Sequence, residues 1–338
     1  MKERVLVLGA GKRAQGVILP ALWCLGDGYE IAGVVARSVR PLSLFGGRLR
    51  LSTVDSLDKI DFKGIDLIML AVSQSAVAGV LADLSRLPVA RSVLMLDTPV
   101  LPLKRVDALR HLRSFRRALV SEDTIALPPF VLARRLIEEG RIGGLKAIYF
   151  FHNGYKYHAL ASLKLLFGGA KIRRIVNRRY PKGRTVKAIR FGNAAQALLF
   201  EPRDYEDCRF LIEGERGHIA DYDFRPEVSR AAGARADFDA QTGTIHPGAG
   251  SVFRIGYRIE DGVYKGLTLD GAPVPMDALD EAYSTRIPRD TPGPTVMKGM
   301  KIRGLMSLIA TATEEFSPLH YSAWAGLRDH WEIKWSDR

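Results

Sequence analysis

Short apolar runs alternate with helical patterns through the first third of the chain. The run at residues 5–8 is continuously apolar, which is typical of a strand buried on both faces of a sheet. Residues 65–72 form another mainly apolar run, and residues 91–96 are predicted to be the next strand. Residues 29–36 form a further candidate strand, and the pattern predicts helices at residues 14–25 and 75–84. Strands and helices that alternate at this spacing predict a parallel sheet with crossover helices, closing near residue 121.

The pattern changes beyond residue 121. Helices are predicted at residues 129–140 and 158–167, and a strand at residues 145–151. Further strands are expected between residues 186 and 224, with turns at Gly192-Asn193, Glu201-Pro202 and Gly214-Glu215. Residues 253–259 and 263–269 flank Asp261-Gly262, which predicts a hairpin, and residues 296–316 and 321–335 are expected to be helical. This part is therefore expected to form an antiparallel or mixed sheet with helices.

A glycine-rich loop follows the first strand and opens the first helix. Its sequence is Gly9-Ala10-Gly11-Lys12-Arg13-Ala14. In this context Gly9 permits a tight turn, Gly11 lets the backbone approach a pyrophosphate, and Ala14 keeps the helix close to the strand. The loop predicts a Rossmann domain over residues 1–121 that binds a dinucleotide at a helix N-terminus. A Rossmann loop that no longer binds anything is the alternative.

The end of the second strand indicates which dinucleotide is preferred. The run Val34-Val35-Ala36-Arg37-Ser38-Val39-Arg40 contains no acidic residue to accept a hydrogen bond from a ribose 2′-hydroxyl. Arg37 and Ser38, with Arg40 as a further candidate, could instead bind a 2′-phosphate, and Lys12 and Arg13 add positive charge nearby. The sequence therefore favours NADP (NADPH) over NAD. The alternative is that Arg37 is an ordinary surface arginine.

Composition narrows the function classes. The chain has 338 residues, which suits two domains, and a formal net charge of +13. Basic residues cluster at residues 110–117, where one solvated helix face is expected, and at residues 171–187. An anionic substrate or a subunit contact suits the second cluster better than nucleic acid, since Tyr180 is its only aromatic residue.

Two cysteines, no apolar run long enough for a membrane span, and a start that reads as a strand rather than a signal peptide favour a cytoplasmic protein. The histidines are scattered and no cysteine lies at ligand spacing, so no metal site is predicted.

In this order the motifs resemble the glucose–fructose oxidoreductase/inositol dehydrogenase/MocA family. The stretches that carry the resemblance are residues 7–16 (VLGAGKRAQG), 65–72 (IDLIMLAV), 96–99 (LDTP), 136–145 (LIEEGRIGGL) and 212–219 (IEGERGHI). The resemblance implies a second α/β domain over residues 122–338 with a large, mainly antiparallel open sheet. It also implies that this sheet forms a homo-oligomer, and that hydride passes between a nicotinamide and a sugar or cyclitol hydroxyl. In this prediction the C-terminal helices can pack back on the first domain.

The chain departs from the family at its proton-handling positions. Where the family commonly has Glu-Lys-Pro this chain has Asp97-Thr98-Pro99, and the family's Asp-x-x-x-His reads Gly154-Tyr155-Lys156-Tyr157-His158. The segment that usually reads Thr-Pro-Asn, near the nicotinamide ribose, is Val72-Ser73-Gln74. By this resemblance Ser73, Gln74, Asp97 and Pro99 are predicted to contact the cofactor.

Four residues are the candidates for proton transfer: His158, Lys156, Tyr155 and Thr98. His158 is expected at a helix N-terminus, where the dipole favours a neutral imidazole, while Tyr155 and Tyr157 would share one face of a strand. Glu122 is expected to contact substrate or to form a surface salt bridge. The leading hypothesis is an NADP-dependent oxidoreductase that reduces a carbonyl or imine, or oxidises a hydroxyl, of a small anionic or sugar-like metabolite. A redox-neutral enzyme with a tightly held cofactor and a non-catalytic sensor or scaffold are the alternatives.

Overall fold

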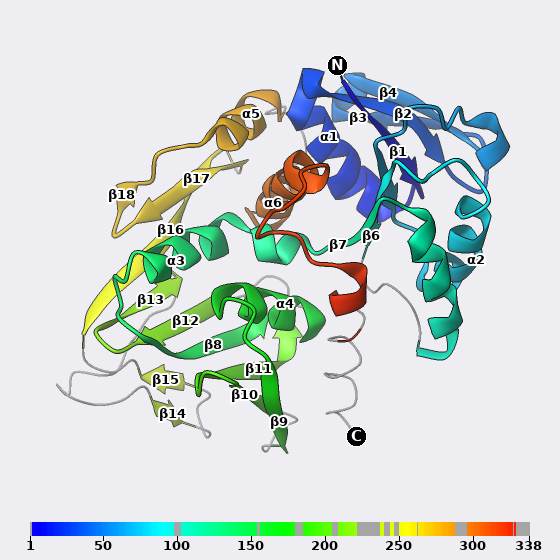
Figure 1. The fold of residues 1–338 in the computed structure, drawn as a ribbon. Coiled ribbons are helices and arrows are strands. Elements are labelled where there is room, and N and C mark those ends of the chain that lie inside the picture. Colours follow the sequence, from blue (N-terminus) through cyan, green and yellow to red (C-terminus); the bar gives the residue numbers. More distant parts are fainter. Residues whose placement is uncertain are drawn as a thin grey trace. The chain divides into compact units, whose positions relative to one another are not determined.

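The chain folds into two units (Figure 1). The first comprises Met1–Ala126, Asp261–Val263 and Met276–Trp331, and the second comprises Leu127–Glu260, Tyr264–Pro275 and Glu332–Arg338. The structure is a computed structural model that describes residues 2–97, 103–153, 156–179, 185–204, 209–221, 237–239, 244–246, 250–261, 263–287, 296–326 and 328. The first division falls after Ala126 rather than at residue 121, and the C-terminal helices are part of the first unit.

A seven-stranded sheet forms the centre of the first unit. Its strands are β1 (Glu3–Leu8), β2 (Tyr29–Val35), β3 (Pro41–Leu44), β4 (Leu49–Val54), β5 (Leu67–Leu70), β6 (Val93–Asp97) and β7 (Arg117–Ser121). They lie in the order β3-β4-β2-β1-β5-β6-β7, and every pair is parallel except β3 with β4. The predicted Rossmann-type parallel sheet is confirmed. The β3–β4 hairpin was not predicted, and it takes the place of a crossover helix between β2 and β4.

Helices cover both faces of this sheet. They are the π-helical turn η1 (Ala14–Ile18), α1 (Leu19–Leu25), α2 (Gln74–Leu84), the 3₁₀ segments η5 (Leu103–Ser114) and η6 (Asp123–Ala126), α5 (Ala278–Arg286) and α6 (Val296–Ala312). Alternate strand residues such as Leu6 and Ile68 pack against α2, while Val7 and Met69 are buried on the other side. Helices α1 and α6 lie against each other (Figure 1). Because Pro20 has no N–H to donate within the helix, the preceding turn widens into η1.

The arginines predicted to share one helix face are arranged differently. Arg110 and Arg113 lie on η5 and are exposed, but Arg116 follows that helix and Arg117 begins β7. Arg116 donates to the carbonyl of Thr313, and Arg117 donates to the carbonyls of Ala312 and Glu315. These two side chains therefore satisfy carbonyl groups at the end of α6, where positive charge is favourable.

The second unit is built on a nine-stranded mixed sheet. Its order is β18-β17-β16-β13-β12-β8-β11-β10-β9, and a separate pair joins β14 to β15. The strands are β8 (Leu145–Asn153), β9 (Ile172–Arg179), β10 (Thr185–Phe191), β11 (Gln196–Asp204), β12 (Arg209–Gly214), β13 (Gly217–Asp221), β14 (Asp237–Asp239), β15 (Thr244–His246), β16 (Ser251–Glu260), β17 (Val263–Leu269) and β18 (Ala272–Pro273). Most pairs are antiparallel, and β8–β11 and β13–β16 are parallel. The predicted α/β fold class is confirmed.

One strand of this sheet is not assigned from the sequence, and one turn is placed wrongly. Residues 172–179, for which the sequence indicates only a charge cluster, form the edge strand β9. Glu201-Pro202 is not a turn: it lies within β11, where the pairing with β8 becomes irregular after Phe200. A strand tolerates proline at such an irregularity because the missing N–H breaks no regular ladder bond.

The second unit contains the helices α3 (Pro128–Glu138) and α4 (Lys156–Leu166), and aromatic side chains pack α3 on the sheet. Phe130 of α3 packs on Phe150 and Phe210 of the sheet, with ring centroids 5.4 and 5.1 Å apart. On the opposite face of β8, Phe151 stacks on Phe200 at 4.9 Å. None of the helices in the described residues combines the length and hydropathy that a membrane-spanning helix needs.

Candidate functional site

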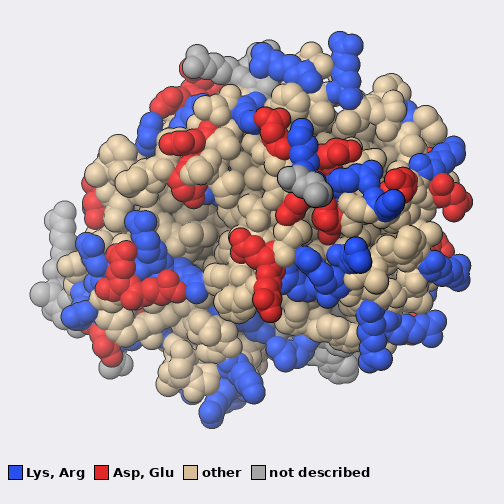
Figure 2. Space-filling model, turned by 45° about the horizontal axis from the view of Figure 1, so that its top comes forward, with Lys and Arg blue, Asp and Glu red and all other residues tan. Residues whose placement is uncertain are grey.

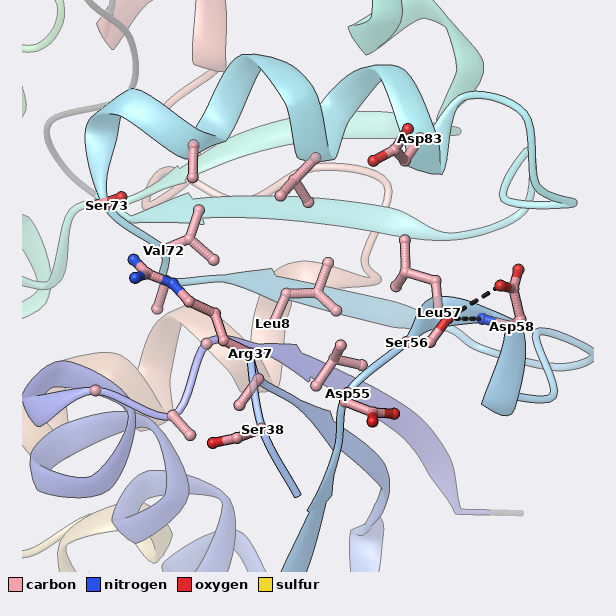
Figure 3. A pocket seen from close by; sticks show the side chains of 18 of the residues that line it. Leu8, Arg37, Ser38, Asp55, Ser56, Leu57, Asp58, Val72, Ser73 and Asp83 are labelled. Atoms are coloured by element: carbon pink, nitrogen blue, oxygen red, sulfur yellow. Dashed lines mark hydrogen bonds between the residues drawn. The ribbon is translucent and has the colours of Figure 1, made fainter. Parts of the chain in front are cut away.

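A cavity of about 950 Å³ opens at the carboxyl ends of the parallel strands of the first unit. Its walls come from the residues that follow β1, β2, β4 and β5, and from one side of α2 (Figure 3). The chain passes from β1 to β2 on one side and later to β5 on the other, so the cavity lies at the topological switch point of the sheet. Ligands of open α/β sheets bind at this position.

The two glycines of the loop have different physical roles. Gly9 has φ +109°, and a Cβ there would overlap the carbonyl oxygen of Ala71. A Cβ added at Gly11 would have no protein atom within 4 Å, so the packing of the protein itself does not require a glycine there. The open space above Gly11 fits a group that approaches the backbone closely, as a pyrophosphate does in this kind of loop.

Side chains brace the loop between these glycines. The carbonyl of Ala10 accepts hydrogen bonds from Gln15 Nε2 at 2.7 Å and from Arg40 Nη2 at 2.8 Å. The loop is therefore fixed from its own helix and from the segment after β2. Arg40, a candidate for a 2′-phosphate contact, uses its guanidinium in this bracing.

Arg37 is the cation of this cavity that has no protein partner among the described residues. Arg40 is bonded to Ala10, and Arg86 faces Asp83 at 3.6 Å. Figure 3 shows the Arg37 side chain extending toward Val72 and Ser73 at the end of β5. The Ser38 hydroxyl, also at the cavity, has no hydrogen bond to the described part of the chain, although the Ser38 carbonyl accepts one from Thr53. Both predicted 2′-phosphate ligands thus line the cavity with their polar groups available.

Sequence reasoning missed one wall of the cavity, the residues after β4. Asp55, Ser56 and Asp58 line it, and the Ser56 side chain accepts from the Asp58 backbone N–H at 3.2 Å. Lys59 holds Asp55 at 2.6 Å, and this hydrogen bond lowers the pKa of the Asp55 carboxyl. The alternation of apolar and polar residues at positions 49–52 is the signal that could have identified β4 and therefore these residues.

Five residues predicted to contact the cofactor do not line this cavity: Lys12, Arg13, Ala14, Gln74 and Asp97. Arg13 instead donates to Asp97 at 3.1 Å and to Asp123 at 2.8 Å. Burial alone would lower the pKa of Arg13, but the carboxylates of Asp123 and Asp97 outweigh it and raise that pKa. The arginine therefore ties the loop helix to the ends of β6 and β7.

Glu122 belongs to the same buried group. It is only 1% exposed, Asp123 is 3% exposed, and Glu122 adds to the negative field around Arg13. The expectation that Glu122 forms a surface salt bridge is wrong, because the residue is buried. A Cβ at Gly304 of α6 would come within 2.8 Å of the Asp123 carbonyl oxygen, so α6 packs closely over this segment.

Two of the four candidates for proton transfer, Thr98 and Tyr155, lie outside the described residues, as does Pro99, which was predicted to contact the cofactor. Lys156 is the first residue of α4, and His158 is half-buried in the first turn, where its carbonyl accepts from Ser162 Oγ at 3.1 Å. His158 is at a helix N-terminus, as predicted. Tyr157 lies in the same helix rather than on a strand, so it does not share a strand face with Tyr155. Within the described ranges, no group of three or more His, Cys, Asp or Glu side chains lies together as a metal site would require.

Comparison with known proteins finds relatives by structure only. No protein-family model and no curated protein matches the sequence. An oxidoreductase from Agrobacterium radiobacter, solved with NAD+, L-tartaric acid and magnesium, matches with a TM-score of 0.60 at 12% identity, over 100% of this chain and 98% of its own. A putative myo-inositol dehydrogenase from Sinorhizobium meliloti matches with a TM-score of 0.58 at 15% identity, over 97% and 94%.

The same fold occurs in Gal80p from Saccharomyces cerevisiae, solved as a super-repressor mutant, with a TM-score of 0.51 at 13% identity over 64% of this chain and 73% of that one. At these identities the likeness establishes a shared fold. The resemblance to inositol dehydrogenase-type oxidoreductases that the motifs predicted is thereby confirmed at the level of the fold.

Proposed function

We propose that the protein is an NADP-dependent oxidoreductase that acts on a carbonyl, imine or hydroxyl of a small, anionic or sugar-like metabolite, with reduction as its working direction. The observation that carries this proposal is that a glycine loop lies in one cavity with the Ser38 hydroxyl and with Arg37, which has no partner among the described residues. An arginine and a hydroxyl suit a 2′-phosphate, whereas a ribose 2′-hydroxyl is usually bound by a carboxylate.

The residues present fit a nicotinamide dinucleotide. The backbone at Gly9 to Gly11 would receive the pyrophosphate, and Arg37 with Ser38 would hold the 2′-phosphate. Ser73 lies at the end of β5 and lines the same cavity. The bound cofactor would supply the hydride. The Asp55 carboxylate directly follows β4 at this cavity, and its ion pair with Lys59 reduces its repulsion of a phosphate.

We assign proton transfer to the segment around His158. Reduction of a carbonyl or imine needs an acid beside the forming hydroxyl or amine, and oxidation of a hydroxyl needs a base. His158 can hold or release this proton at its imidazole, with Lys156, Tyr155 and Thr98 as the further donors in the proposal. Relatives of this fold support the reaction class, since one was solved with NAD+ and L-tartaric acid, a small dicarboxylic hydroxy acid.

Nucleotide titration tests the proposal. The purified protein, freed of bound nucleotide, is titrated with NADPH and with NADH by fluorescence, and tighter binding of NADPH is expected. Arg37→Asp should weaken NADPH by about ten- to a hundred-fold, the loss of one charge-assisted contact, while NADH changes little. Arg86→Gln is the matched control, because Arg86 lines the same cavity but is paired with Asp83. Absence of binding to either nucleotide rules out the proposal.

Two alternatives rest on the residues that replace the family's lysine and aspartate, Thr98 and Gly154. A nucleotide-binding sensor or scaffold would bind NADPH and never oxidise it, and the shared fold of Gal80p shows that this architecture is not confined to proteins described as oxidoreductases. A redox-neutral enzyme would retain its nucleotide and turn over without external NADP. Loss of NADPH absorbance with a panel of carbonyl and imine substrates, abolished by His158→Ala at unchanged NADPH affinity, separates the proposed enzyme from both.

We further propose that the nine-stranded sheet forms a homo-oligomer. Sheets of this size with an open face usually require a partner. Sedimentation velocity of the full chain measures the assembly state directly, and a monomer at micromolar concentration contradicts this part of the proposal.

A further inference from the structure

A second cavity, of about 640 Å³, lies in the second unit beside the turn that joins β10 to β11. Four cationic side chains and two side-chain amides line it: Lys146, Arg173, Arg174, Arg190, Asn193 and Gln196. No acidic residue belongs to its lining. The cavity is separate from the nucleotide site, because every residue in its wall belongs to the second unit.

The strand register places two of these arginines directly opposite each other. In the antiparallel pair β9–β10, Arg174 faces Arg190, and in the pair β10–β11, Arg190 faces Gln196. Residues opposite each other in a sheet share a face, with Cβ atoms about 5 Å apart, and like charges in that arrangement destabilise the sheet. The register therefore holds two positive charges together at a cost in stability that a bound anion would remove.

The cations of this cavity have no protein partner within the described ranges. Lys146, Arg173, Arg174 and Arg190 form no ion pair and no hydrogen bond there, whereas Arg216 and Arg258 of the same unit are bonded to Gly140 and Glu260. The amide group of Asn193 is also available as a donor, because its oxygen already accepts from the N–H of Ala195 at 3.3 Å. The described residues of the wall thus supply several hydrogen-bond donors and no negative charge to balance the cations.

Basic side chains do not form one continuous field on the face shown in Figure 2, where Lys and Arg lie interspersed with Asp and Glu. Phe191, the only aromatic side chain among the described residues that line the second cavity, is 2% exposed and therefore cannot stack on a nucleic-acid base. This favours a small anion over a single-stranded nucleic acid.

We propose that this cavity binds a small multivalent oxyanion, a phosphorylated metabolite with two or more phosphate groups. Arginine forks donate two parallel hydrogen bonds to phosphate oxygens, and two arginines on adjacent strands can hold two phosphate groups of one ligand. Lys146 adds a further charge, and the amides of Asn193 and Gln196 supply neutral donors. The site does not depend on the nucleotide site of the first unit.

Inorganic pyrophosphate is the probe for this site. It is titrated by calorimetry into the full chain, into Arg174→Gln/Arg190→Gln, and into the control Arg178→Gln, with potassium chloride of equal ionic strength as the blank. Arg178 lies on the same strand and face as Arg174, opposite Val186, and outside the cavity wall. We expect affinity at least ten-fold weaker in the double variant and unchanged in the control. The free double variant should melt at the same or a higher temperature than the parent, because the repulsion between the two arginines is relieved.

Equal pyrophosphate affinity in the parent and the double variant overturns the proposal, as does a short single-stranded oligonucleotide that binds this face when pyrophosphate does not. If the double variant does not fold, Lys146→Gln/Arg173→Gln replaces it with the same expectation. Any pyrophosphate bound at the glycine loop of the first unit is common to all of these variants, so the difference between them reports the second cavity alone.

Discussion

The two cavities differ in how their charges are balanced. In the first unit, Arg40 is bonded to Ala10, Arg86 faces Asp83, and Asp55 is paired with Lys59, which leaves Arg37 as the available cation. In the second unit, four cations line one cavity with no acidic residue among them. The first cavity can therefore select a ligand by the shape of its backbone together with one cation, and the second depends mainly on charge.

Recognition by backbone shape and recognition by charge should respond differently to substitution. A cavity shaped by glycine depends on single backbone positions, so its function should fail sharply on one substitution. A cavity built from several like charges should lose affinity gradually and should respond strongly to salt, because exposed charges are screened. Substitutions in each unit can distinguish recognition by backbone shape from recognition by charge.

Gly9→Ala should have the largest effect. The positive φ of Gly9 and the overlap of a new Cβ with the Ala71 carbonyl both oppose the substitution. Together they should lower the free energy of unfolding by about 3 kcal/mol or more, measured by urea denaturation. Gly11→Ala is the matched variant, because its Cβ meets no protein atom. It should leave stability within about 0.5 kcal/mol of the parent and weaken NADPH binding by the loss of close approach.

Equal stability losses at Gly9 and Gly11 would contradict this division of roles. Full NADPH affinity in Gly11→Ala would contradict the placement of a pyrophosphate over that residue.

Removal of Arg13 should have the next largest effect. It would leave the buried Asp123 and the neighbouring Asp97 without their cation. The first unit would then contain uncompensated negative charge, whereas the second cavity contains uncompensated positive charge. Breaking a buried pair costs several kcal/mol, and because Arg13 is partly exposed we expect Arg13→Met to lose about 2–3 kcal/mol of unfolding free energy. Arg86→Met, which removes an exposed pair with Asp83, should cost less than about 0.5 kcal/mol.

A double-mutant cycle of Arg13→Met with Asp123→Leu measures the pair itself. If the double variant loses as much as the sum of the two single variants, the ion pair contributes nothing and the arrangement is only a matter of packing.

Much of the first unit was predictable because its signals are local. The apolar runs of β1, β5 and β6 are buried on both faces, so continuity alone identified them, and the glycine loop lay where such a strand ends. The β3–β4 hairpin was missed because Pro41 and Gly46-Gly47 interrupt its pattern. Because this hairpin was missed, Asp55 and Ser56 were not identified as cavity residues; they line the cavity because β4 lies beside β2.

The remaining misses involve contacts that the sequence order does not reveal. The sequence predicts that Arg13 faces the cofactor, but its partners Asp97, at the end of β6, and Asp123, the first residue of η6, lie far along the chain. The sequence indicates a basic cluster around Arg174. That Arg174 and Arg190 share a face of the sheet is shown only by the register of β9 with β10. Charge is readable from sequence, whereas its compensation depends on tertiary packing.

His218 should make the second unit sensitive to pH. It is 1% exposed, lies opposite Glu213 in the sheet, and its ring nitrogens have no hydrogen-bond partner in the described structure. Burial lowers the pKa of His218, with Lys146 acting in the same direction and Glu213 against it. Because the folded state disfavours the protonated ring, its stability should be complete above a pH of about 6.5, the usual value for an unfolded histidine, and should fall as the pH drops below it.

Urea unfolding at about pH 8 and about pH 5.5 measures this dependence in the parent and in His218→Gln. The variant should lose less stability on acidification than the parent, since Gln does not titrate. Identical pH dependence in the two proteins would show that His218 is not protonated in this range or is hydrated in the folded state.

Ala194→Gly should have the smallest effect, and it probes the turn at the second cavity. Ala194 has φ +65°, a left-handed conformation that costs an alanine about 1 kcal/mol, and glycine removes that cost while adding some backbone entropy to the unfolded state. A net gain of about 0.5 kcal/mol in unfolding free energy is expected. Ala195→Gly is the control, because the buried Ala195 has no positive φ and should lose about 1 kcal/mol. Since recognition in this cavity is assigned to charge, pyrophosphate affinity should be the same in both variants. A change of affinity in Ala194→Gly alone would mean that the backbone of the turn shapes this site too, which would remove the contrast with the glycine loop of the first unit.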